Sequence, residues 1–113
     1  MNKIFIDQGK EAITFNNVSI LQGLYDTIKD RQKEVSYKIN FQYIYQKLLF
    51  HACIKESKDC ITFLRNLYLN KFDDVSKIAL RQSFFYGKYL MKDEKLIDWY
   101  DQNIISKIRK KIL

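Results

Sequence analysis

The sequence predicts a mainly α-helical protein of four to five antiparallel helices joined by short connections. Apolar residues recur at spacings of three and four from residue 17 almost to the end, which is the pattern of amphipathic helices. The chain has no proline and only three glycines, so few residues interrupt long helices. Its length of 113 residues is typical of one domain with a modest core. We therefore expect residues 1–113 to form a single helical domain.

The first fifteen residues do not share the helical pattern. They contain two short β-prone runs, KIFID and AITF, separated by a segment that includes Gly9. This order is typical of a small β-hairpin, which would have to lie against the helices because an isolated hairpin is only marginally stable. The alternative for residues 1–15 is an irregular arm.

Two helices are expected in the first half of the remaining chain. Asn16 or Asn17 can supply the N-cap oxygen of the first helix. Its apolar stripe comprises Val18, Leu21, Leu24, Tyr25 and Ile28. The second helix has the most regular stripe, which comprises Phe41, Ile44, Tyr45, Leu48, Leu49 and Ala52. The segment VSYKIN between the two helices fits either a short strand or an approach to the second helix.

Three more helices are expected to begin at hydroxyl or carboxylate caps. The candidate caps are Ser57 or Asp59, Asp73 or Asp74, and Asp93. The stripes are, in order, Cys60, Ile61, Leu64, Leu67 and Tyr68; Val75, Ile78, Ala79, Phe85, Tyr86, Tyr89 and Leu90; and Leu96, Ile97, Tyr100, Ile104, Ile108 and Ile112. Gly87 lies inside the second of these helices, where glycine costs about 1 kcal/mol relative to alanine. We therefore expect a close helix contact at Gly87.

The arrangement of the helices has two alternatives. Short connections place consecutive helices side by side and antiparallel. The segments LLFHACIKESKDCITFL and SFFYGKYLMKDEKLIDWY both read as an aromatic helix, a charged turn and an apolar helix. Their offset of about 35 residues is the length of a helical-hairpin repeat. Residues 41–112 thus resemble, in pattern only, a fragment of an α-solenoid, and a simple orthogonal bundle fits equally well.

The stretch HACIKESKDC holds the only histidine and both cysteines of the chain. A zinc site needs four nitrogen or sulfur ligands, and His51, Cys53 and Cys60 are only three candidates. His51 and Cys53 are two positions apart on a helix, so they point in different directions. We predict no metal site and no thiol nucleophile here. The stretch is best interpreted as the turn of a helical hairpin, with the cysteines as packing groups.

Other catalytic constellations are also disfavoured. The close carboxylate pairs are Asp73–Asp74, Asp93–Glu94 and Asp98–Asp101. The first two pairs lie at expected helix starts, where acidic residues act as caps and dipole partners. The three glycines are too far apart for a phosphate-binding loop. We therefore expect a protein that is not an enzyme and needs no cofactor.

The cellular location follows from what the sequence lacks. No window approaches the roughly 20 apolar residues that span a bilayer, and Asp7 interrupts the short apolar run at the N-terminus. We expect a soluble cytoplasmic protein without a membrane span. Its two cysteines are then expected to be reduced thiols.

The aromatic content predicts a binding surface. Phe, Trp and Tyr make up 15% of the residues, more than a core of this size needs. Some of them fall beside or opposite the apolar stripes, and exposed aromatic patches mark interaction sites. We expect partner contacts from Tyr37, Tyr43, His51, Phe63, Phe84, Tyr89 and Trp99.

These features favour a small protein-binding module that neutralises its partner by occupying its surface. Bacterial or phage inhibitors and toxin-neutralising immunity proteins work in this way, although this is a class-level analogy. The net charge of +7 suits an acidic protein partner.

The alternative is nucleic-acid binding through the lysine-rich C-terminal half. Its contacts would come from Lys107, Arg109, Lys110 and Lys111, which could equally meet an acidic partner. Only four of the twenty basic residues are arginine, and arginine makes the commonest base contacts. That scarcity argues against the alternative.

Overall fold

The computed structural model describes residues 2–34 and 38–110, and every regular element in this part of the chain is helical. The elements are α1 (Asn2–Thr14), α2 (Val18–Gln32), α3 (Phe41–Lys55), α4 (Lys58–Lys71), α5 (Asp74–Lys88), α6 (Glu94–Tyr100), the π-helical turn η1 (Asp101–Ile105) and α7 (Ser106–Lys110). Helices α6, η1 and α7 follow one another without a break, so the described residues form six helical rods. The predicted all-helical class is confirmed, and the expected count of four to five helices is too low.

The additional helix is α1, so the prediction of a β-hairpin or an irregular arm over residues 1–15 is wrong. The buried residues of α1 recur at helical spacing and are Phe5, Ile6, Gly9, Ala12 and Ile13. Helix α1 packs closely on α3, because a Cβ atom built on Gly9 would lie 2.5 Å from Cδ2 of Leu48. Packing against α3 therefore outweighs the β-propensity of the isolated runs.

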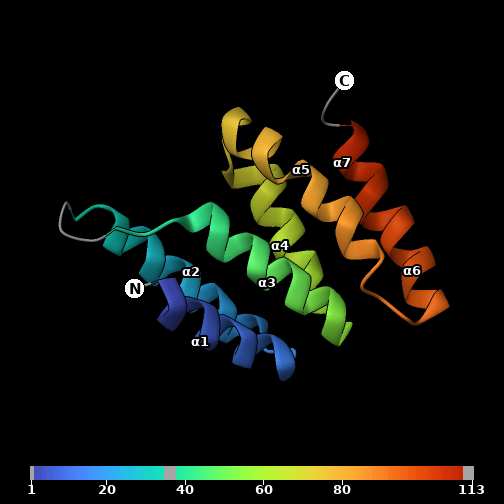
Figure 1. Cartoon of the computed structure of the whole chain (residues 1–113), viewed down its shortest axis with the longest axis horizontal. Helices are drawn as coiled ribbons and strands as arrows, with labels where there is room; N and C mark the ends of the chain where they lie inside the picture. The colour runs from blue at the N-terminus through green and yellow to red at the C-terminus, as the bar shows by residue number, and fades with distance from the viewer. Residues whose placement is uncertain (1, 35–37, 111–113) are drawn as a thin grey trace.

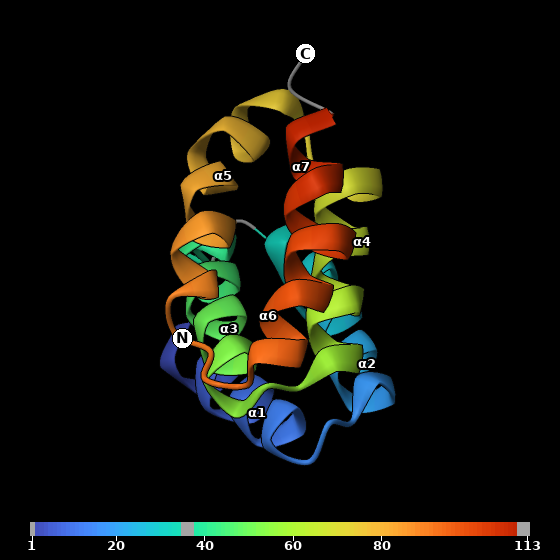
Figure 2. The same ribbon diagram turned by 90° about the vertical axis from the view of Figure 1, so that its right-hand side faces the viewer.

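Three helical hairpins stack side by side in two layers (Figures 1 and 2). One layer contains α1, α3 and α5, and the other contains α2, α4 and the rod α6–η1–α7. Figure 2 shows the first layer on its left and the second on its right. Of the two arrangements that the sequence left open, these contacts match the stacked hairpins.

Hydrogen bonds between helices of the first layer show that they run parallel. At the start of α1, Oδ1 of Asn2 accepts from the backbone N–H of Asn40, and at its end Oγ1 of Thr14 lies 3.0 Å from Nε2 of His51. The same direction holds between α3 and α5, where Gln42 bonds Ser76 and Gln46 bonds Ser83. Parallel helices within a layer are typical of a hairpin stack.

Three fully buried tyrosines connect the layers and satisfy backbone carbonyls at the same time. Their hydroxyl groups donate to Leu64 (from Tyr45), Lys77 (from Tyr68) and Phe84 (from Tyr100). A buried hydroxyl group without a partner would be costly, so these bonds fix how neighbouring helices meet.

Most of the expected helix starts are confirmed. The side chains of Asn17, Asp73 and Asp93 each accept a hydrogen bond from a backbone N–H of the following first turn. Ser57 occupies the N-cap position of α4, but its hydroxyl group donates to the carbonyl oxygen of Ile13 at 2.7 Å. Ser57 therefore joins two hairpins instead of capping its own helix.

The predicted buried side of α5 is wrong for most of its members. Phe85 and Leu90 pack against the core, but Val75, Ile78 and Tyr89 are exposed, with exposed fractions of 73%, 78% and 82%. The residues that α5 buries instead are Leu80, Ser83, Phe84 and Gly87. Helix α5 thus has two apolar stripes, and the buried one is the stripe that the sequence analysis did not predict.

Glu56 joins the second hairpin to the third. Its backbone is in the left-handed region, with φ 55°, and its Oε2 atom accepts from the backbone N–H groups of Lys92 and Asp93 at 3.2 and 2.8 Å. A left-handed conformation costs a non-glycine residue about 1–2 kcal/mol. The carboxylate contacts offset that cost.

Glu56→Ala is expected to lower the free energy of unfolding by about 1–2 kcal/mol, because charge-assisted hydrogen bonds are lost while the backbone strain remains. Glu56→Gly is expected to cost about 1 kcal/mol less than Glu56→Ala, since glycine adopts this conformation freely. Urea denaturation of both variants measures the difference. Equal stability of the alanine variant and the wild type would contradict the bridging role of the carboxylate.

Candidate functional site

The exposed side of α3 forms the centre of the candidate site. Helix α3 buries Ile44, Tyr45, Leu48, Leu49, Ala52 and Cys53 against the rest of the protein. With 100° per residue, this leaves the opposite side of the helix facing outward. The residues on that side are Tyr43, Lys47, Phe50, His51 and Ile54, of which Tyr43 and Ile54 are about half exposed. The outward side of α3 is thus mainly aromatic and aliphatic.

Helix α5 extends this surface. Its exposed apolar residues Val75, Ile78, Tyr86 and Tyr89 fall within about 80° on the helix circumference. The ring of Tyr86 lies 5.1 Å from the ring of Phe50 in an edge-on contact, which connects the two helices. We call the surface formed by these α3 and α5 residues the outer face.

A hollow of about 270 Å³ lies in the outer face where α1, α3 and α5 meet. Its lining residues are Lys10, Lys47, Phe50, His51, Ile54, Tyr86 and Leu90. We call this hollow the outer pocket. Four of its lining residues are apolar or aromatic and its three other side chains are basic, so no carboxylate lines it.

The cations around the outer pocket have no carboxylate partner among the described residues. Lys47 makes a cation–π contact with the ring of Tyr43 at 5.4 Å, and neither Lys10 nor Lys55 forms an ion pair in the described part of the chain. Burial of His51 lowers its pKa, and the positive charges of Lys10 and Lys55 lower it further. The pocket is therefore a positively charged environment.

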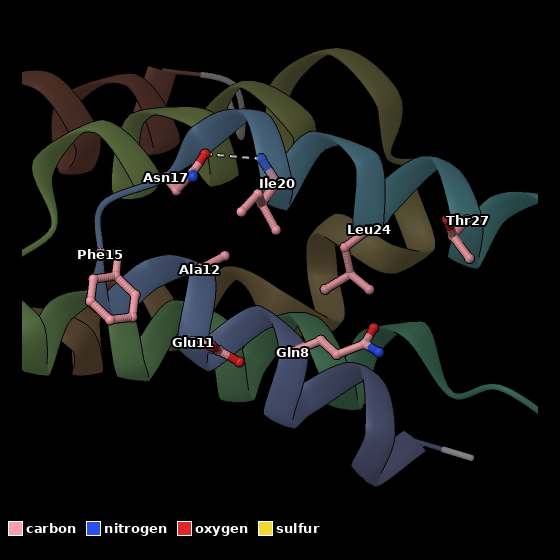
Figure 3. A pocket seen from close by; sticks show the side chains of 8 residues that line it. All are labelled: Gln8, Glu11, Ala12, Phe15, Asn17, Ile20, Leu24 and Thr27. Carbon is pink, nitrogen blue, oxygen red and sulfur yellow. Dashed lines mark hydrogen bonds between the residues drawn. The ribbon is translucent and has the colours of Figure 1, made fainter.

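A second, larger hollow of about 440 Å³ lies between α1 and α2, at the end of the hairpin stack (Figure 3). It is lined by Gln8, Glu11, Ala12, Phe15, Asn17, Ile20, Leu24 and Thr27. Phe15 and Ile20 are exposed at this groove, and Asn17 is occupied in capping α2. Glu11 is the one charged residue in this lining, so the groove does not select a partner by charge.

The structure brings three of the predicted contact residues together. Tyr43, His51 and Tyr89 all lie on the outer face. Phe63 and Trp99 are half-buried in the other layer, on α4 and α6. Their rings are occupied locally, since Phe63 packs against the core and Lys58 lies 4.9 Å from the ring centre of Trp99.

The prediction that Phe84 contacts a partner is wrong. Its side chain has no exposed surface, and its ring packs 4.9 Å from the ring of Tyr68. Phe84 is a core residue because α5 turns the stripe of Leu80, Phe84 and Gly87 inward. The other predicted contact residue, Tyr37, lies outside the described residues.

The basic residues predicted for nucleic acid do not line the outer pocket. Lys107 and Arg109 are exposed on α7, in the second layer. The guanidinium group of Arg109 lies 5.6 Å from the ring centre of Phe85. Lys111 and the side chain of Lys110 lie outside the described residues. The basic residues of α7 and those of the outer pocket are thus carried by helices of different layers.

Both cysteines are buried free thiols. Burial raises the pKa of the Cys53 thiol to about 12, and the neighbouring hydroxyl group of Tyr100 offsets part of that rise. Burial and the negative charge of Asp59 raise the pKa of Cys60 to about 11. In the part of the chain that the structure describes, no three His, Cys, Asp or Glu side chains are placed to hold a metal ion.

We expect both thiols of the folded protein to react slowly with iodoacetamide at pH 8. With these raised pKa values the reactive thiolate is about one molecule in a thousand or fewer, and burial blocks access. Unfolding in guanidinium chloride is expected to restore the reactivity of an ordinary cysteine. Mass spectrometry over a time course measures both rates, and labelling of the native protein at the unfolded rate would contradict the burial of the thiols.

Sequence reasoning missed several residues of this site. Lys10 fell within the expected hairpin, Lys47 was not among the expected contact residues, and Tyr86 was assigned to the buried stripe of its helix. The second stripe of α5, formed by Leu80, Phe84 and Gly87, repeats at spacings of four and three and was the signal that could have exposed Tyr86. No sequence pattern predicts that residues of α1, α3 and α5 line one pocket, because these helices are far apart along the chain.

No helix in residues 2–34 and 38–110 is long and apolar enough to cross a membrane. Comparison with protein-family models, with curated proteins and with solved structures finds no match for this chain. An account of its function therefore depends on the geometry of the outer face.

Proposed function

We propose that the chain is a non-catalytic protein-binding module that acts by occupying the surface of a partner protein through the outer face. The observation that carries this proposal is the outward apolar side of α5. Val75, Ile78 and Tyr89 are each more than 70% exposed, although the same helix buries a complete second stripe. Exposed apolar residues gathered on one side of a helix, here interrupted by the polar Gln82, mark interaction surfaces.

The composition of the outer face supports a protein partner. Its aromatic members Tyr43, Phe50, Tyr86 and Tyr89 belong to residue types that supply large contact areas with few rotatable bonds, and tyrosine is frequent among interface anchors. They are carried by two helices that pack side by side, so little order has to be gained on binding. An inhibitor or immunity protein uses such a rigid surface to block its target, and we propose this role for the chain.

The alternative function, nucleic-acid binding, has weaker support. A nucleic-acid site needs cations along the path of a phosphate backbone, whereas Lys107 and Arg109 lie in the other layer from Lys10 and Lys47. The outer pocket also contains no arginine. An electrophoretic shift at low salt tests the alternative, and a complex that weakens steeply with salt would favour it.

Affinity capture from a lysate of the source organism tests the proposed function. We expect the wild-type chain to retain a protein that the double variant Ile78→Asp/Tyr89→Asp does not retain, since two buried carboxylates would disrupt an apolar interface. Both positions are exposed, so the variant is expected to fold normally.

Phe15→Asp is the matched control, because Phe15 is an equally exposed aromatic residue at the α1–α2 groove. It is expected to retain the same protein as the wild type. Equal capture by the wild type and the α5 double variant, with both variants folded by circular dichroism, would count against the outer face as the binding surface.

A further inference from the structure

We propose that the outer pocket binds an acidic segment of the partner, with one apolar side chain inserted in the pocket and neighbouring carboxylates paired with Lys10, Lys47 and Lys55. This inference rests on the proposed function and names the chemistry of the partner. It places the central contact at the meeting point of α1, α3 and α5.

The apolar part of the pocket suits a single side chain. Phe50, Ile54, Tyr86 and Leu90 line a hollow of about 270 Å³, in which Phe50 and Tyr86 support each other by their edge-on ring contact. Small hydrophobic hollows of this kind are where interface anchors are typically inserted. The occupant therefore presents a Phe, Leu or similar side chain.

The charged part of the pocket determines which residues of the partner can flank the inserted apolar side chain. Lys10 of α1 and Lys47 of α3 line the hollow, and Lys55 of α3 is close enough to lower the pKa of His51, which also lines it. None of the three forms an ion pair within the described residues. Complementary charge across an interface speeds association and excludes partners of the wrong sign. An acidic segment matches both this local charge and the net charge of +7.

Two other occupants match the pocket less well. A second copy of the chain would bring another net charge of +7 and the same lysines to the interface. A nucleic acid would find the cations, but the rings of Phe50 and Tyr86 already pack edge-on against each other. The other apolar lining residues, Ile54 and Leu90, offer a base no flat surface for stacking.

His51 provides an internal reporter of binding. Its ring contacts Thr14 of α1, and the charged groups that lower its pKa are Lys10 of α1 and Lys55 of its own helix. The ionisable neighbour from α5 in the same pocket is Tyr86. Carboxylates placed among these lysines reduce the positive field, so bound acidic peptide raises the pKa of His51. By linkage, the affinity then increases as the pH falls and His51 becomes protonated.

Titration of the ¹⁵N-labelled full chain with three capped pentapeptides tests the inference. The peptides have the sequences DEFDE, DEGDE and KKFKK. We expect saturable amide shifts at Phe50, His51 and Ile54 with DEFDE, an affinity at least about tenfold lower with DEGDE, and no saturable shifts with KKFKK. The ring proton of His51 should titrate at a higher pH when DEFDE is bound.

Charge variants supply the matched comparison. Lys10→Ala/Lys47→Ala is expected to weaken DEFDE binding about five- to tenfold, while Lys95→Ala, an exposed lysine on α6 in the other layer, leaves it unchanged. Equal weakening by both variants would overturn the inference, because the response would then reflect net charge only.

Three other outcomes would also overturn it. They are an absence of shifts with DEFDE, tighter binding of a short oligothymidylate at the same amides, and shifts of these amides on raising the protein concentration alone, which would indicate a second copy. The proposed function is judged separately. If the wild type captures a host protein and the Ile78→Asp/Tyr89→Asp variant does not, the proposed function is supported even if DEFDE does not bind. If both capture the protein equally, the proposed function is contradicted even if DEFDE binds.

Discussion

Phe84→Ala is expected to lower the free energy of unfolding by about 3–5 kcal/mol, the cost of emptying a buried phenylalanine site. Phe84 has no exposed surface, and its ring lies between those of Tyr68 and Tyr45 at 4.9 and 6.3 Å. Its backbone carbonyl accepts from the hydroxyl group of Tyr100, and the alanine variant retains that bond. The expected loss therefore measures the packing of the ring itself. Because domains of this size are stable by only about 5–15 kcal/mol, urea denaturation should show a large shift of the midpoint.

Tyr89→Ala is the matched control on the same helix. Tyr89 is 82% exposed, so its truncation is expected to change the stability by about 0.5 kcal/mol or less. The pair decides which side of α5 faces the core, since the predicted apolar stripe of this helix contained Tyr89 but not Phe84. A larger loss from Tyr89→Ala than from Phe84→Ala would contradict the structure of this hairpin.

The sequence was most informative where an apolar stripe repeats without a gap. The stripe of α3 does so, and its expected buried residues Ile44, Tyr45, Leu48 and Leu49 are all buried. The N-caps Asn17, Asp73 and Asp93 could be predicted from the sequence, because a short polar side chain directly before an apolar stripe has few other roles. These features depend on interactions within one or two turns of helix.

The sequence was least informative where distant contacts decide the structure. KIFID and AITF are β-prone as isolated runs, yet α1 is helical because it packs along α3, with Gly9 against Leu48. Helix α5 has two apolar stripes of similar strength, and only the position of α3 and of the rod α6–η1–α7 decides which one is buried.

The candidate site illustrates the same limit. Tyr43, His51 and Tyr89 were expected to contact a partner because they are aromatic or rare residues beside a stripe. The convergence of Lys10, Lys47 and Tyr86 on one pocket depends on how three hairpins stack, so it required the structure. Residue types and local spacing thus predicted some residues of the outer face, whereas the outer pocket could be recognised only from the three-dimensional structure.

Gly87→Ala is expected to lower the free energy of unfolding by about 1–3 kcal/mol, the usual cost of overpacking a core. A Cβ atom on Gly87 would lie 2.8 Å from Sγ of Cys53 and 3.1 Å from Oη of Tyr100. Both groups are buried, and the hydroxyl group of Tyr100 donates to the carbonyl oxygen of Phe84, so neither can move without loss. This contact between α5, α3 and α6 agrees with the close approach that the sequence predicted at Gly87.

Gly23→Ala is the matched control, because Gly23 is also inside a helix but a Cβ atom added to it would have no neighbouring atom within 4 Å. This variant is expected to gain about 0.5–1 kcal/mol from the higher helix propensity of alanine. The two substitutions are chemically identical, so opposite signs in urea denaturation isolate the steric contact at Gly87.

Cys53→Ala supplies the second comparison, since it removes the Sγ atom that the new methyl group would meet. In the double variant Gly87→Ala/Cys53→Ala the penalty is expected to be smaller than the sum of the two single penalties, with a coupling of about 0.5–3 kcal/mol. Additive penalties would mean that Gly87 and Cys53 do not share one contact, and the stacking of α5 on α3 would then need a different explanation.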